Sequence, residues 1–61
     1  MQPYIDHHET ARILGISLRT LYRWRKDGSG PPFMKIGHKI IRYERADVLR
    51  FMDEKKTKKY K

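Results

Sequence analysis

The sequence contains no cysteine, which excludes disulfide bonds and thiolate metal sites. It has no apolar run near the roughly 18 residues that a membrane-spanning helix requires. The amino-terminal stretch also lacks the apolar segment of a signal peptide. We therefore expect a soluble protein of the reducing cytoplasm.

Acidic residues are scarce: seven Asp and Glu stand against fifteen Lys and Arg, which leaves a formal net charge of +8 on 61 residues. A chain of this length forms one domain with a small core. So large a charge on so small a body favours polyanionic partners, with nucleic acid first and an anionic membrane surface second. The lysine-rich end, KKTKKYK, has Tyr60 as its one apolar side chain. We therefore expect no membrane partner.

Capping residues mark a first helix over 7–14. Asp6 followed by Glu9 is a pattern in which the aspartate accepts an early backbone N–H and the glutamate reaches back. Gly15 suits the left-handed residue that ends such a helix. The side expected to face the core carries Thr10, Ala11, Ile13 and Leu14.

A second helix over 18–26 is predicted from Ser17, a good N-cap residue. Leu21 and Trp24 lie within about 60° on a helical wheel and are expected to face inward, with Trp24 between the helices and the hairpin. The opposite side carries Arg19, Arg23 and Lys26, with Tyr22 beside them. An ordinary amphipathic helix with a solvated charged face is the alternative. The residues before it, the small Ala11, the turn residue Gly15 and the cap Ser17, instead have the spacing of a helix-turn-helix.

Residues 27–32 contain four Gly and Pro and predict a loop. Strands over 33–36 and 39–43 follow, joined by Gly37 and His38 in a two-residue turn. This register predicts a core face made of Met34, Ile36, Ile41 and Tyr43. The other face would then carry Phe33, Lys35, Ile40 and Arg42.

A third helix over 45–54 places Val48, Phe51 and Met52 on one stripe. Leu49 lies off this stripe, either at the edge of the core or in a contact with another protein. The order helix, helix, hairpin, helix predicts a compact winged helix-turn-helix, mostly α with one small β-hairpin (α+β). We expect one domain over 1–54 and a basic flexible tail over 55–61.

Three motifs occur together: G-I-S-x-x-T-L-Y-R-W, G-P-P-F-x-K-I-G and R-Y-x-R-A-D. Over about residues 4–53 the chain resembles the small AlpA/excisionase-type helix-turn-helix domains related to the DNA-binding head of MerR regulators. The resemblance implies a winged-helix protein of a phage or mobile element that binds duplex DNA. Such a protein acts as an excisionase that steers an integrase, or as an AlpA-like regulator at a promoter. The chain departs from the family pattern at Asp6 (usually Thr), His7 (usually apolar) and His38 (usually Arg).

The resemblance assigns residues to the recognition helix and to the tip of the wing. An outward basic helix suits the major groove, where an arginine donates two hydrogen bonds to guanine. We expect Arg19 and Arg23 to read bases, and Arg25 and Lys26 to contact phosphates. The full set of predicted DNA-binding residues is Ser17, Arg19, Thr20, Tyr22, Arg23, Arg25, Lys26, Lys35, His38 and Lys39.

Other functions have less support in the sequence. His7 and His8 point about 100° apart on a helix and have no third ligand at matching spacing, so no metal or other cofactor is expected. The chain offers no nucleophile with a nearby base, so we do not expect an enzyme. A module that binds an acidic protein is the remaining alternative. We expect a nucleoid-associated protein that is a monomer in solution, because no apolar heptads that could form a coiled coil follow the third helix. On DNA we expect several copies to bind cooperatively as a multimer.

Overall fold

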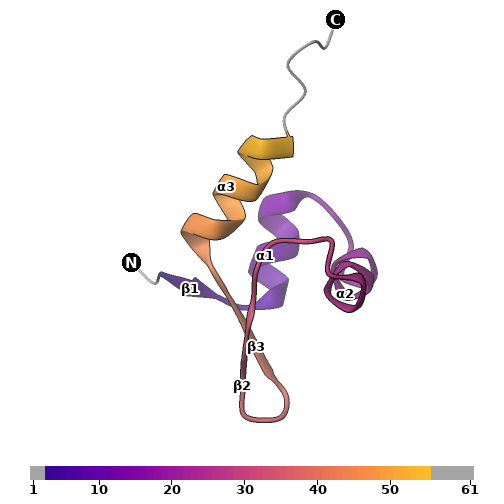
Figure 1. The fold of residues 1–61 in the computed structure, drawn as a ribbon, viewed down its shortest axis with the longest axis vertical. Coiled ribbons are helices and arrows are strands. Elements are labelled where there is room, and N and C mark those ends of the chain that lie inside the picture. Colours follow the sequence, from indigo (N-terminus) through magenta and orange to yellow (C-terminus); the bar gives the residue numbers. More distant parts are fainter. Residues whose placement is uncertain (1–2, 56–61) are drawn as a thin grey trace, which may run out of the picture.

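The computed structural model describes residues 3–55, which form three helices and three short strands (Figure 1). They follow in the order β1 (Tyr4–Ile5), α1 (His7–Leu14), α2 (Leu18–Asp27), β2 (Met34–Ile36), β3 (Ile40–Glu44) and α3 (Arg45–Lys55). The predicted α+β fold is confirmed, and α2 and α3 each extend one residue beyond the predicted end. The predicted basic tail over 55–61 lies outside the described residues except for Lys55, which ends α3.

The predicted caps bound the first two helices. The Asp6 carboxylate accepts the Glu9 N–H at 2.9 Å, and the Ser17 hydroxyl accepts the Thr20 N–H at 3.1 Å. Gly15 has a φ of 71°, a left-handed conformation that favours glycine, and its N–H closes the helix on the Ala11 carbonyl at 2.8 Å. Helix α1 therefore ends at Gly15, where the chain turns toward α2.

One half of the first predicted cap is wrong. The Glu9 carboxylate does not reach back to the helix start but accepts the Arg12 Nε–H at 2.9 Å along the outer side of α1. This pair lies three residues apart on one helix face, where opposite charges meet readily.

The strands form an antiparallel sheet in the order β1-β3-β2, and β1 was not predicted. Its two residues are too short to show an alternating pattern. Strand β1 is fixed by pairing Ile5 with Tyr43, and the Arg45 N–H donates to the Pro3 carbonyl at 2.7 Å. Residues 3–5 thereby pair with the junction between β3 and α3.

The predicted hairpin register is wrong by one residue. Ile36 pairs with Ile40, so the connection has three residues rather than two. A slip of one residue moves a strand's side chains to the opposite face. Lys35 therefore shares a face with Ile41 and Tyr43, while Met34 and Ile36 lie on the outer face, where both are exposed.

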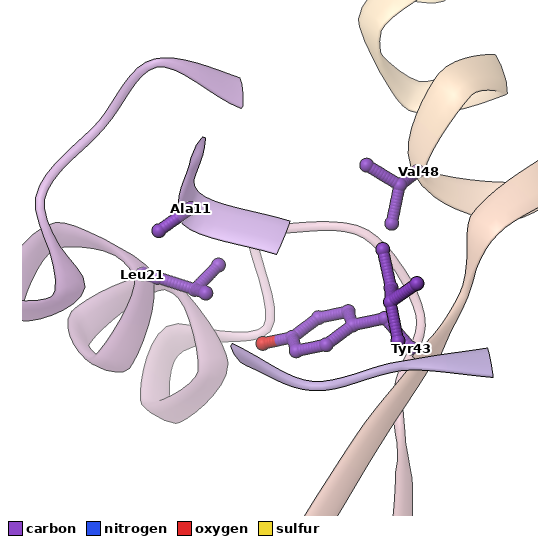
Figure 2. Close-up of a cluster of buried hydrophobic side chains, with 5 residues drawn as sticks. Ala11, Leu21, Tyr43 and Val48 are labelled. Atoms are coloured by element: carbon purple, nitrogen blue, oxygen red, sulfur yellow. The ribbon is translucent and has the colours of Figure 1, made fainter. Parts of the chain in front are cut away.

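The core lies where α1, β3 and α3 meet α2. Helix α1 packs against α2, α3 and β3, while the hairpin projects away from the helices (Figure 1). Figure 2 shows Leu21 and Tyr43 directed toward one another within this cluster. The buried side chains are Ile5, Thr10, Ala11, Leu21, Pro31, Tyr43 and Val48.

The remaining predicted core residues are only partly buried or exposed. Trp24 is half-buried and lies against Phe51 of α3, with ring centroids 5.7 Å apart. Gly30 leaves room for this indole, because a Cβ there would meet the Trp24 Cβ at 3.1 Å. Met52 and Leu49 are exposed, so the predicted α3 stripe holds for Val48 and Phe51 but not for Met52. Within residues 3–55 no helix is long and apolar enough to cross a membrane.

Candidate nucleic-acid interface

The outer face of α2 is basic and open to solvent. Arg19 and Arg23 are exposed, while Leu21 is turned inward with 1% of its surface exposed. Tyr22, exposed by 54%, lies beside them. The five residues 19–23 thus present two guanidinium groups and one phenol ring on a single accessible surface.

The start of α2 is fixed by its own side chains. The Ser17 hydroxyl accepts the Thr20 N–H and lies 3.1 Å from the Thr20 hydroxyl. Helix amino termini carry a partial positive charge that favours phosphate. No acidic residue stands in the first turn of α2 to offset that charge.

A cleft of about 470 Å³ separates α2 from the hairpin. Its walls come from both elements, and Lys35 reaches it because the observed register turns this side chain toward α2. Two aromatic rings, Tyr22 and Phe33, flank the basic groups. The side chains that line the cleft are Tyr22, Arg25, Lys26, Phe33, Lys35, His38, Lys39 and Ile41.

Arg25 occupies the inner end of this cleft and is half-buried. Its Nη1 donates to the Tyr43 hydroxyl at 3.4 Å. Its guanidinium carbon lies 5.4 Å from the centroid of the Tyr22 ring and 5.9 Å from that of Phe33. Arg25 therefore contacts Tyr22 of its own helix, the loop before β2, and β3.

The cations of this surface are free of carboxylate partners. The two ion pairs found among residues 3–55 lie elsewhere, Arg12 with Glu9 on α1 and Arg50 with Asp47 on α3. Unneutralised charges gathered on one side of a small protein attract a polyanion and speed its association.

The structure brings the predicted site residues together on two adjoining elements. Those from Ser17 to Lys26 lie on α2 or at its cap, and Lys35, His38 and Lys39 lie on the hairpin or its turn. Sequence reasoning missed Phe33 and Tyr43, which touch or face the arginine of the cleft. A three-residue turn would have placed both on the Lys35 face, but Gly37-His38 equally suits a shorter turn.

The histidines of α1 lie apart from this surface. The rings of His7 and His8 approach with centroids 4.5 Å apart. The described part of the chain holds no group of three or more His, Asp or Glu arranged to hold a metal ion.

Residues 4–56 match a protein family described as a helix-turn-helix domain. A search of curated proteins gave no match. The matched segment contains α1, α2, the hairpin and α3.

Proposed function

Because the chain belongs to the helix-turn-helix family that covers small AlpA/excisionase-type proteins, we propose that it binds double-stranded DNA in a sequence-specific way. The observation that carries this proposal is the unneutralised basic surface that runs from α2 across the cleft to the hairpin. Recognition helices of this class enter the major groove, and an adjoining wing reaches the neighbouring backbone or minor groove.

In this proposal α2 and the hairpin make different kinds of contact with DNA. Arg19 and Arg23 project from the exposed face of α2 and read base edges, since a guanidinium donates two parallel hydrogen bonds to guanine. Tyr22 offers its ring to a thymine methyl group. Ser17 and Thr20 fix the start of α2, whose free backbone N–H groups contact a phosphate.

The wing and the end of α2 supply contacts that are independent of sequence. Lys26, Lys35 and Lys39 line the cleft and contact the phosphate strand between the two grooves. His38 lies in the turn that forms the wing tip and extends the surface toward the minor groove.

Two biological roles use the same surface. As an excisionase the protein would bind and bend attachment-site DNA together with an integrase; as an AlpA-like regulator it would bind a promoter. Both belong to a phage or mobile element and act on DNA of the prokaryotic nucleoid. Footprinting over the DNA that flanks its own gene separates them. Protection at an attachment site supports excision, and protection over a promoter supports regulation. No protection of any duplex at low salt would instead favour an acidic protein partner.

A single copy presents one short helix and one wing, so it buries little DNA surface. We propose that the free protein is a monomer and that neighbouring copies bind adjacent sites cooperatively. Exposed apolar side chains are available for contacts between copies, with Leu49 beside an apolar depression on α3 and Ile40 on the outer hairpin face. Sedimentation should show one 7.4 kDa species, and the footprint should lengthen stepwise with protein concentration. A stable dimer without DNA would contradict this.

A further inference from the structure

Arg25 differs from the other basic residues of α2 in where its charge lies. Lys26, the next residue, is exposed, whereas Arg25 is half-buried between α2 and the hairpin. A side chain used only for a phosphate contact gains nothing from being partly enclosed by protein. Its position therefore points to a task inside the protein.

Its contacts join three separate parts of the fold. The guanidinium donates to the Tyr43 hydroxyl on β3 at 3.4 Å and lies over the rings of Tyr22 on α2 and Phe33 before β2. The Phe33 and Tyr43 rings also approach, with centroids 6.1 Å apart. Arginine suits such a place because its planar group stacks on rings while its edge donates hydrogen bonds.

Arg25 adds a polar link between α2 and the hairpin to the core contact of Leu21 with Tyr43. The backbone of α2 packs against α1, while the hairpin extends away from the helices with its tip far from α3 (Figure 1). Two neighbouring grooves of DNA are engaged together only when the helix and the wing keep a fixed relative position, so the angle of the wing bears directly on affinity.

We propose that Arg25 is a positioning residue that holds the wing against the recognition helix through Tyr43 and the two flanking rings, rather than a phosphate contact. This inference rests on the proposed DNA binding. Its central consequence concerns Tyr43, which is 1% exposed and cannot touch DNA: its hydroxyl should nonetheless matter for DNA affinity.

The first test is Arg25→Lys, which keeps the positive charge but loses the planar group. We expect affinity for the specific site to fall about 5- to 10-fold, while the dependence of log K on log salt keeps its slope. Arg25 acting on a phosphate would instead leave the affinity nearly unchanged, because lysine replaces arginine well as a point charge. Wild-type affinity in Arg25→Lys would overturn the proposal.

The second test is Tyr43→Phe, which removes only the buried acceptor. We expect a loss of specific affinity of similar size to Arg25→Lys, with an unchanged melting temperature. In the double variant Arg25→Lys/Tyr43→Phe the losses should not add, because both changes break one link. Full additivity would overturn the proposal, and wild-type affinity in Tyr43→Phe would overturn it even where Arg25→Lys fails to fold.

Lys26→Met is the matched control, since Lys26 neighbours Arg25 and is exposed. It should weaken binding to specific and scrambled duplexes alike and reduce the salt slope by about 0.9. Failure of the proposed function is distinguishable, because then the wild-type protein itself binds no duplex. In that event, NMR contacts in the free protein between the side chain of residue 25 and the Tyr22 and Phe33 rings still test the link. These contacts should weaken in Arg25→Lys, and unchanged contacts would overturn the proposal.

Discussion

Leu18 and Leu21 are one helical turn apart on α2, yet 40% of Leu18 is exposed and only 1% of Leu21. The same substitution at the two positions therefore separates burial from helix propensity. A domain of this size is stable by about 3–9 kcal/mol, so the loss of one large core side chain is a large share of the total.

We predict that Leu21→Ala lowers the free energy of unfolding by about 3 kcal/mol, because it leaves a cavity against Tyr43 and its neighbours. Leu18→Ala should lower it by less than about 1 kcal/mol. Urea unfolding followed by Trp24 fluorescence measures both. Equal losses would show that Leu21 lies outside the core.

How far the site could be predicted from the sequence differs from residue to residue. The outward placement of Arg19 and Arg23 follows from helical period alone, once Leu21 is assigned to the core. The partial burial of Arg25 does not, because it depends on rings from a hairpin whose register the sequence leaves open. Periodicity locates a face of a helix, but not what another element lays against it.

At the scale of elements, the ends of the first two helices were predicted from the sequence, because residues within one turn determine them. Asp6, Gly15 and Ser17 mark helix ends because their side chains or backbone conformations act within one turn. The hairpin register and β1 are set by pairing with distant segments, so sequence patterns missed both. A turn of two residues and a turn of three require nearly the same amino acids. Tyr43 faces the core with either turn, so its burial does not tell which residues of β2 lie on the same face.

The cap of α1 gives a prediction about pH. The hydrogen bond from the Glu9 N–H lowers the pKa of the Asp6 carboxyl below its ordinary value of 3.8. A group with a lowered folded-state pKa stabilises the protein above its unfolded pKa, and this stabilisation is lost as the pH falls through the folded pKa.

We therefore predict that Asp6→Asn, which caps without a titrating group, loses less melting temperature than the wild type as the pH is lowered from 6 to below 4. The Glu9 carboxyl, whose pKa is lowered by its hydrogen bond with Arg12, titrates in both proteins and cancels in the comparison. Thermal melts followed by circular dichroism test this. Parallel pH curves for the two proteins would show that the Asp6 charge plays no part.

The whole molecule carries its charge unevenly, and four more lysines follow α3 in the sequence among residues 56–61. Each phosphate that a protein neutralises releases counterions, so binding weakens with salt in proportion to the number of phosphate contacts.

With about five such contacts, log K should fall with log salt at a slope of about −4 to −5. Removing residues 56–61 should flatten this slope and leave the preference for the specific site intact. A variant with the four lysines changed to glutamine controls for chain length and should behave like the deletion. An unchanged slope in both would mean that this segment stays off the DNA.

The central claim is that α2 reads DNA sequence, and the most direct measurement is a titration of four proteins against two duplexes at one salt concentration. The duplexes are the footprinted site and a scrambled version; the proteins are the wild type, Arg19→Ala, Arg23→Ala and Lys26→Ala. Loss of either arginine should cost about 1–3 kcal/mol on the specific site and little on the scrambled one, whereas Lys26→Ala should weaken both alike. Equal losses on the two duplexes for Arg19→Ala and Arg23→Ala would contradict the account.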